Sequence, residues 1–228
     1  MNLLVLGCGK TGSLVAETAR QRGHQVQVVR AADNASAAAL TPEALKQIDV
    51  AIDFTTPQAV LENITACARA GTNMVVGTTG WYSELDRVRT LVEESGLGLV
   101  YGSNFSIGVN LFFDIIRASA AALELGYRGQ IFERHHAQKK DAPSGTAASI
   151  QKIVRETSGK EVEITSFREG DVVGMHELIL DSPADEIYLC HDSKSRRGFA
   201  EGAVRAAEWL QGRTGFYDFK DIWRRLPA

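Results

Sequence analysis

The chain has 228 residues, of which 44% are hydrophobic and 23% charged, and its formal net charge is −3. This size allows one large domain or two small ones, and the composition is ordinary for a soluble globular protein. The slight negative charge argues against nucleic acid as a partner, and no apolar run approaches the roughly 20 residues that span a bilayer. Cys8, Cys67 and Cys190 have neither disulfide nor zinc-site spacing, so we expect a cytoplasmic protein without a metal site.

The first residues predict the start of a nucleotide-binding domain. An apolar run from Leu3 to Leu6 has the pattern of a strand buried on both faces, and a Gly-Cys-Gly-Lys-Thr-Gly turn follows at Gly7 to Gly12. A helical pattern then continues to Gly23. In this context the glycines permit a tight turn, and the helix N-terminus faces a pyrophosphate. A plain strand-turn-helix is the alternative.

The second predicted strand, Gln25 to Arg30, bears on the choice of cofactor. An acid at its end would bind the ribose 2′-hydroxyl of NAD, but this strand ends in Arg30 and the nearest acid is Asp33. Arg30 would pair with the 2′-phosphate of NADP, with help from Lys10, whereas Asp33 would serve NAD from the loop. The pattern favours NADPH or use of both cofactors, although Arg30 could equally be a solvated strand end.

The alternation of strands and helices up to residue 106 predicts a parallel, doubly wound sheet of the Rossmann type. Ligands of such sheets lie outside the carboxyl ends of the strands. Small and polar turns at Gly77 to Thr79 and Gly102 to Phe105 are therefore candidates for cofactor contacts, with ordinary loops as the alternative. The expected strands are Val50 to Phe54, Asn73 to Val76 and Leu97 to Tyr101, and the expected helices are 58–70 and 82–95.

Residues 107 to 195 predict a second, α+β domain for substrate binding. A helix with core spacing is expected over 108–125, a strand over 130–133 and a helix over 147–157. Three short runs follow without an intervening helix, which predicts an open, mostly antiparallel sheet. Such a sheet tends to be covered or paired with another subunit. The three runs are 162–168, 171–180 and 185–192.

The stretch Glu133 to Thr146 is the densest in groups that move protons or hold anions. His135 and His136 can each carry a proton near neutral pH, and Lys139 adds fixed positive charge. Ser-Gly-Thr then supplies hydroxyl and N–H groups where a helix is expected to begin. This combination predicts an anionic substrate, a carboxylate, held beside an acid/base pair. A solvated loop would explain the paired histidines alone.

The remaining segments complete two domains. His176 lies in an expected strand, where it is either a core histidine or a site residue. An amphipathic helix over 198–212 and a short final helix over 216–223 should return to the first half and cover its sheet. We therefore expect residues 1–106 with 196–228 to form the dinucleotide-binding domain and 107–195 the substrate domain.

These motifs together resemble the 4-hydroxy-tetrahydrodipicolinate reductase (dihydrodipicolinate reductase) family. Its specific signature, His-His-x-x-Lys-x-Asp-Ala-Pro-Ser-Gly-Thr, spans His135 to Thr146, and similar segments cover nearly the whole chain. The resemblance implies NAD(P)H-dependent reduction of 4-hydroxy-tetrahydrodipicolinate to tetrahydrodipicolinate, in the diaminopimelate route to lysine. It also implies a homotetramer joined through the antiparallel sheets. The glycine-rich turn departs from the family's usual Gly-x-x-Gly-Arg-Met-Gly, which bears on cofactor preference.

The resemblance also assigns roles to residues. His135 would be the proton donor/acceptor and Lys139 a proton donor, while His136, Gly145 and Thr146 would bind the dicarboxylate. A different dehydrogenase, acting on aspartate or a sugar, would explain the first half but not the signature. A non-catalytic nucleotide sensor would bind cofactor without turnover. The candidate contacts of NADPH or NADH are Gly7, Cys8, Gly9, Lys10, Thr11, Gly12, Arg30, Gly77, Thr78, Thr79, Gly102, Ser103, Asn104 and Phe105.

Overall fold

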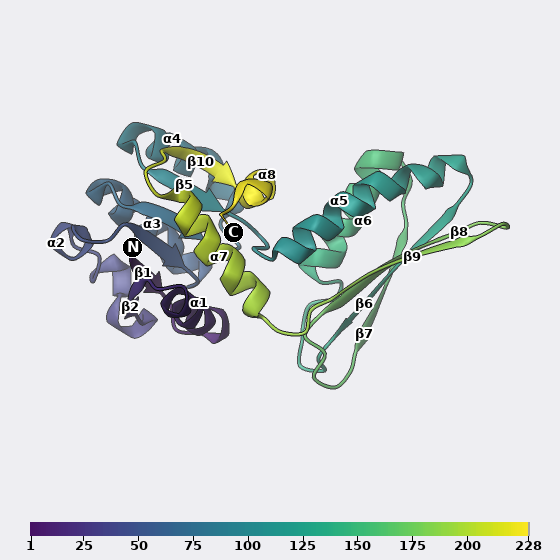
Figure 1. Cartoon of the computed structure of the whole chain (residues 1–228), viewed down its shortest axis with the longest axis horizontal. Coiled ribbons are helices and arrows are strands. Elements are labelled where there is room, and N and C mark those ends of the chain that lie inside the picture. The colour runs from purple at the N-terminus through teal and green to yellow at the C-terminus, as the bar shows by residue number, and fades with distance from the viewer. Residues whose placement is uncertain (228) are drawn as a thin grey trace. The chain divides into compact units, whose positions relative to one another are not determined.

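The structure is a computed structural model that describes residues 1–227, and it divides into two compact units (Figure 1). Unit 1 comprises Met1–Ile107 together with the described chain from Arg197 onward, and unit 2 comprises Gly108–Arg196. Unit 2 is thus inserted between two segments of unit 1. Within the described residues, no helix combines the length and the apolar character needed to cross a membrane.

Unit 1 is built on a six-stranded sheet in the order β10-β5-β4-β3-β1-β2, and all of its neighbouring strands run parallel (Figure 1). The strand order reverses beside β1, where β2 lies on one side and β3 on the other. Such a switch point is where doubly wound sheets bind ligands. The predicted fold class is confirmed. The strands are β1 Asn2–Leu6, β2 Gln25–Val29, β3 Val50–Asp53, β4 Asn73–Val76, β5 Gly98–Tyr101 and β10 Gly215–Asp218.

Helices bury both faces of this sheet. Strand residues such as Leu3 and Ile52 pack with α1 and α7 on one face, and Leu6 and Met74 pack with α3 and α4 on the other. The inner strands β1, β3, β4 and β5 are therefore mainly apolar rather than alternating, as expected for a sheet covered on both sides, whereas the edge strand β2 alternates Gln and Val. The helices are α1 Lys10–Gln21, α2 Pro42–Leu45, α3 Pro57–Ala70, α4 Leu85–Ser95, α7 Arg197–Leu210 and α8 Phe219–Ile222, with 3-10 turns at Ala31–Asp33, Ala35–Ala37, Tyr82–Glu84 and Trp223–Arg225.

The last segment differs from the sequence expectation. Residues 216–223 are predicted as one short helix, but Gly215–Asp218 forms the edge strand β10 beside β5, and only Phe219–Ile222 is α-helical. Phe216 stacks on Tyr101 of β5 with ring centroids 4.8 Å apart. A four-residue strand is too short to show a period, so only its partner strand reveals it.

Unit 2 contains a four-stranded mixed sheet in the order β7-β6-β8-β9. The β6–β8 and β8–β9 pairs are antiparallel, as expected, but β7 runs parallel to β6 and does not pair with β8. The reason is that α6 connects β6 to β7 as a crossover, which a parallel pair requires. The elements are α5 Ile107–Ser119, the 3-10 turn Ala120–Leu125, β6 Arg128–His135, α6 Gly145–Ser158, β7 Glu163–Arg168, β8 Met175–Asp181 and β9 Glu186–Asp192.

Strand β6 leads from the core of unit 2 to its polar cluster. Ile131 is fully buried against apolar side chains of α5 and α6. Because side chains alternate along a strand, Ile131, Glu133 and His135 share one face. That face changes from apolar to charged towards the C-terminal end of β6, and the polar cluster begins there.

Candidate active site

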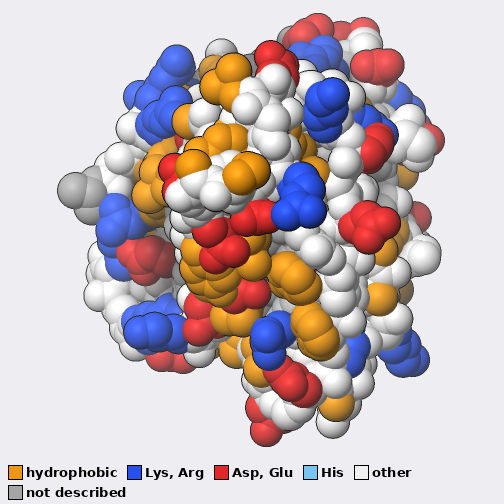
Figure 2. All heavy atoms as spheres, turned by 90° about the vertical axis from the view of Figure 1, so that its right-hand side faces the viewer, with side chains coloured by type: hydrophobic (Ala, Val, Ile, Leu, Met, Phe, Trp, Pro, Cys, Tyr) orange, Lys and Arg blue, Asp and Glu red, His pale blue; other side chains and the backbone are white. Residues whose placement is uncertain are grey.

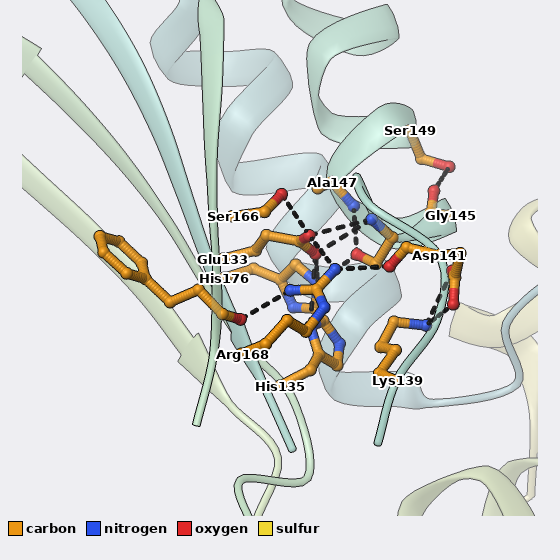
Figure 3. Close-up of polar contacts among 12 residues, drawn as sticks. Glu133, His135, Lys139, Asp141, Gly145, Ala147, Ser149, Ser166, Arg168 and His176 are labelled. Carbon is orange, nitrogen blue, oxygen red and sulfur yellow. Dashed lines mark hydrogen bonds and ion pairs between the residues drawn. The ribbon is translucent and has the colours of Figure 1, made fainter. Parts of the chain in front are cut away.

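Glu133 is a fully buried carboxylate at the centre of the polar cluster in unit 2 (Figure 3). The Ser144 amide donates to both of its oxygens at 3.1 Å, the Ser166 hydroxyl donates at 2.7 Å, and the Arg168 guanidinium at 2.8 Å. Burial alone would raise the pKa of Glu133, but these donors outweigh it and lower the pKa to about 2. The carboxylate is therefore ionised at any physiological pH.

His135 ends β6 and is only 7% exposed. Its Nδ1 lies 3.3 Å from Oε2 of Glu133, within ion-pair distance but without hydrogen-bond alignment. Its ring meets that of His176 edge-on, with centroids 5.1 Å apart. Burial lowers the pKa of His135, the charge of Glu133 opposes this, and Lys139 and Arg168 lower the pKa further. Without a bound anion, the imidazole is therefore predominantly neutral at pH 7.

His176 lies directly opposite Glu133 in the antiparallel β6–β8 pair. The sequence left open whether it is a core or a site histidine. The structure buries it to 4% exposure, places its Nε2 3.0 Å from the Ser144 hydroxyl and packs it against His135. Burial, with a contribution from His135, lowers the pKa of His176 to about 4. His176 is thus an uncharged side chain at pH 7 that packs against the cluster.

Lys139 and Asp141 form an ion pair in the loop after β6 (Figure 3). The Lys139 ammonium donates to both carboxylate oxygens of Asp141, at 2.7 and 2.8 Å, and its hydrogen bonds lower the pKa of Asp141. Arg168 donates to the Asp141 carbonyl at 2.6 Å while it also donates to Glu133. The loop that carries Lys139 is therefore tied to the buried carboxylate.

The 14-residue helix α6 begins at the same cluster with Gly145 and Thr146. Ser144 is its N-cap, and the Ser144 hydroxyl accepts from the Ala147 amide at 3.2 Å. Gly145 is exposed, with open space where a Cβ would stand. A helix start presents N–H groups and a partial positive charge, which suits a carboxylate. His136 is half-buried just past the end of β6.

The glycine-rich turn of unit 1 has the backbone geometry that its sequence predicts. Gly7 has φ +94°, and a Cβ there would stand 2.4 Å from the Phe54 carbonyl oxygen. A Cβ on Gly12 would stand 2.2 Å from the Gly7 carbonyl oxygen, so α1 packs against the turn as only glycine allows. Gly9 caps α1 with open space beside it. The residues present therefore fit a dinucleotide at the start of α1.

The other cofactor candidates are Gly77 to Thr79 after β4, Gly102 to Phe105 after β5 and Arg30 after β2, all at the carboxyl edge of the sheet. Their side chains differ in exposure to solvent. Thr79 and Ser103 are exposed, whereas the Phe105 ring is buried 4.5 Å from that of Phe219. The side-chain Oδ1 of Asn104 accepts from the Ser106 amide at 2.9 Å. Thr78 is buried, and its hydroxyl donates to the Asp53 carboxylate at 2.6 Å. Arg30 lies on the surface, where its Nε donates to the Asp33 carboxylate at 2.7 Å.

Two residues of the cluster are assigned no role from the sequence. Glu133 opens the charged stretch and Arg168 ends the expected strand 162–168, and the contact between them organises the cluster. In unit 1, Asp53 is a fully buried carboxylate that accepts from Thr55, Thr78 and Asn63, which ties the ends of β3 and β4 to α3.

Comparison with known proteins decides the family. The family description "Dihydrodipicolinate reductase, N-terminus" matches residues 1–105, and "Dihydrodipicolinate reductase, C-terminus" matches residues 108–223. The chain belongs to the dihydrodipicolinate reductase family. It is 36% identical to the 4-hydroxy-tetrahydrodipicolinate reductase of Christiangramia forsetii, with 97% of each chain covered. It is 37% identical to that of Natronomonas pharaonis, with 97% and 99% covered.

Solved structures agree on the fold. A dipicolinate-bound dihydrodipicolinate reductase from Paenisporosarcina sp. TG-14 has a TM-score of 0.80 at 24% identity, covering 97% of this chain and 99% of that one. An amine dehydrogenase from Mycobacterium smegmatis shares the fold at a TM-score of 0.63, but at 12% identity. Membership of the dihydrodipicolinate reductase family confirms the predicted activity, the reduction of 4-hydroxy-tetrahydrodipicolinate in diaminopimelate and lysine biosynthesis. It also implies a nicotinamide cofactor.

Proposed function

We propose that unit 2 supplies both the proton and the carboxylate-binding groups for this reduction. His135 is the proton donor, Lys139 is a second donor, and the start of α6 binds a carboxylate. The observation that carries this proposal is that an imidazole and a helix N-terminus meet one ionised carboxylate, Glu133, while Arg168 links Glu133 to the loop in which Asp141 pairs with the Lys139 ammonium (Figure 3). Such a cluster suits a ring that bears two carboxylates and must be protonated.

The chemistry divides between cofactor and protein. Gly7 to Gly12 would hold the pyrophosphate of a nicotinamide dinucleotide, and in its reduced form this cofactor would supply the hydride that reduces C4 of the conjugated cyclic imine left when the substrate loses water. Charge then collects on the ring nitrogen and the adjacent carbon, so a proton must be supplied. Nδ1 of His135 faces Glu133, which leaves Nε2 to hand over the proton. Lys139 assists the departing hydroxyl or holds a carboxylate.

Substrate binding would convert His135 into an acid. Burial and nearby cations keep the pKa of its imidazole below the ordinary value in the free protein. A doubly negative ring beside Lys139 and Arg168 offsets their positive charge and adds its own attraction for a proton, so the pKa of His135 rises. The protein would thus be protonated at His135 mainly when the dianion is in place.

Carboxylate binding is shared by a side chain and backbone groups. The Lys139 ammonium has Asp141 as its partner, and a substrate carboxylate would compete for the same donors. Gly145 and Thr146 would bind the second carboxylate through first-turn amides, with His136 beside them. The exposure of Gly145 supports this assignment, because no heavy atom of the described residues lies within 4 Å of where its Cβ would stand.

We infer that the active form is a homotetramer assembled through unit 2. Large hydrophobic side chains with substantial exposure are concentrated there, and Figure 2 shows hydrophobic groups among charged ones on one face. Edge strand β9 contributes Tyr188, which is 53% exposed. Tyr188→Lys should reduce the mass measured by light scattering, and an unchanged mass would place the interface elsewhere. The exposed set in unit 2 is Leu111, Ile115, Leu125, Phe167, Ile187 and Tyr188.

The proposal is tested with His135→Gln and freshly made 4-hydroxy-tetrahydrodipicolinate. Turnover should fall severely, by on the order of 100-fold or more, because a positioned acid contributes about that factor. Cofactor affinity should be nearly intact, since the substitution lies in the other unit. His191→Gln, at a half-buried histidine of β9, is the matched control. Full turnover in His135→Gln would remove this residue from its role.

A further inference from the structure

We propose that Glu133 is a positioning residue for the reduction: one carboxylate orients the imidazole of His135 and fixes the start of α6. The proton donor and the carboxylate-binding amides would then be set by the same buried group. This inference rests on the proposed role of His135, but it concerns a residue that would not touch the substrate.

The first half of the proposal is the contact between Glu133 and His135. The two residues are two apart on β6, so they share one face of the sheet. Oε2 of Glu133 lies 3.3 Å from Nδ1 of His135, and this nitrogen is buried and makes no hydrogen bond to any described residue. A buried N–H without an acceptor is unfavourable. A small ring rotation that aims Nδ1–H at Oε2 is therefore favoured, and it leaves Nε2 as the nitrogen that can exchange a proton.

The second half is the contact between Glu133 and the helix start. The Ser144 N–H donates to both carboxylate oxygens of Glu133, and Ser144 is the N-cap of α6. The direction of the amides at Gly145 and Thr146 follows from that cap. On the other side, Arg168 bridges Oε1 of Glu133 and the carbonyl of Asp141. The same carboxylate therefore also holds the loop that carries the proposed second donor.

The charges around His135 give Glu133 a measurable effect. Glu133 faces the ring from β6, Arg168 from β7, and neutral His176 from β8. The loop after β6 adds Lys139 with its partner Asp141. Glu133 raises the pKa of His135, whereas Lys139 and Arg168 lower it. Removing the carboxylate would leave Arg168 unpaired beside the imidazole, so both changes act in the same direction.

The decisive experiment follows the imidazole of His135 by NMR in the full-length protein. Glu133→Gln keeps the size of the side chain but removes its charge, and the titration of His135 should move to lower pH. At pH 7, kcat should fall by on the order of 100-fold, while affinity for NADPH stays within about twofold. A purely structural role predicts a changed melting temperature with an unchanged His135 titration, and that outcome would overturn the proposal.

Ser166→Ala is the matched control. It deletes the 2.7 Å hydrogen bond to Oε1 but leaves the carboxylate charged. The His135 titration should stay within a few tenths of a pH unit, and kcat should stay within a few-fold of the wild type. A shift as large as that of Glu133→Gln would mean that the packing of the cluster, rather than the charge of Glu133, controls His135.

Arg168→Gln keeps the proposal testable if Glu133→Gln does not fold. This change removes a cation and leaves the carboxylate, so the His135 titration should move to higher pH, opposite to Glu133→Gln. No upward shift would contradict the proposed coupling. The role of His135 and the role of Glu133 are tested by different outcomes. Full turnover in His135→Gln would reject His135 as the proton donor. The NMR titrations test the effect of Glu133 on His135 independently of the kinetics.

Discussion

Gly174 lies against the imidazole of His135. A Cβ built on Gly174 would stand 3.0 Å from Nε2 and 3.3 Å from Cδ2 of that ring, and the backbone of Gly174 does not need a positive φ. A Cβ there would therefore require the ring to shift by a few tenths of an ångström. We predict that Gly174→Ala displaces the ring and lowers kcat by about 10- to 100-fold, because small misplacements of a reacting group have effects of this size. Steady-state kinetics with 4-hydroxy-tetrahydrodipicolinate measures it.

The control for this prediction is Gly198→Ala in α7. A Cβ on Gly198 would meet only the Ser106 hydroxyl at 3.5 Å, an ordinary contact, so kcat and thermal stability should be unchanged. Full turnover in Gly174→Ala would show that the ring tolerates displacement, and that its position is not decisive for catalysis.

The fold was predictable where the apolar pattern is long, or where Gly or Pro marks the end of an element. The strands before Gly7 and Gly77 and the helix after Thr56-Pro57 lie close to where the sequence places them. The strand β10 and the parallel pairing of β7 were not predictable, because both are decided by partner strands far away in the chain. Thr56 is the N-cap of α3 and Pro57 its first residue, but the Thr56 hydroxyl makes no capping hydrogen bond.

The sequence predicts which short stretch carries the site, but not which distant residues contact it. The sequence identifies His135 and Lys139 because they stand in one short, charged stretch. The contact that joins Glu133 to Arg168 spans 35 positions, and the one that joins Ser144 to His176 spans 32. Sequence spacing does not encode such contacts, because strand pairing and the α6 crossover create them.

The pair formed by Lys139 and Asp141 predicts opposite effects of two substitutions. Lys139→Gln removes an ammonium that a substrate carboxylate would use, so KM should rise more than tenfold and kcat should also fall. Asp141→Asn removes the competing carboxylate from the same ammonium, so KM should fall by a few-fold. Both effects should shrink at high ionic strength. If KM rises in Asp141→Asn as well, Asp141 holds Lys139 in place rather than competing with the substrate.

The pKa of His135 should depend on a bound dicarboxylate. Burial lowers it in the free protein, and a dianion next to the ring should raise it. NMR titration with and without dipicolinate, as the named ligand of the related structure, should show a lower midpoint in the free form. Correspondingly, kcat should decline as pH rises through the pKa of the complex. Identical midpoints in both forms would mean that the anion does not bind beside His135.

Acid should destabilise the protein in two stages. The pKa of His176 is about 4 in the fold, below the ordinary 6.5, so the unfolded chain takes up the proton more readily. The contribution of neutral His176 to the free energy of unfolding is complete above pH 6.5. About 3 kcal/mol of it is lost as the pH falls to 4. The pKa of Glu133, about 2 in the fold against 4.5, adds a further loss as pH falls from 4.5 to 2.

Urea unfolding at a series of pH values measures this loss. His176→Gln should reduce the slope between pH 6.5 and 4, to which His135 also contributes, while leaving the lower stage. His24→Gln is the control, because His24 lies in unit 1, in the ion pair with Glu208. An unchanged slope in His176→Gln would show that other groups, and not this buried imidazole, cause the acid sensitivity.

The pair formed by Arg30 and Asp33 predicts the cofactor preference. Both side chains are mostly exposed, 68% and 52%, and Nε of Arg30 lies 2.7 Å from Oδ2 of Asp33. An exposed pair of this kind is weak, so the 2′-phosphate of NADPH can replace Asp33 as the partner of the guanidinium. Arg30→Ala should raise KM for NADPH about tenfold and leave NADH nearly unchanged. Asp33→Ala should lower KM for NADPH and raise it for NADH, because the carboxylate that would accept from the ribose 2′-hydroxyl is lost.

Arg87 offers a matched control for this last prediction, since it forms a similar exposed pair with Glu84 three residues away. Arg87→Ala should change neither KM value. Because phosphate recognition is electrostatic, the difference between NADPH and NADH should narrow as salt is added. If Arg30→Ala affects both cofactors equally, the guanidinium contacts a part that they share, and the preference must be set elsewhere in the turn from Gly7 to Gly12.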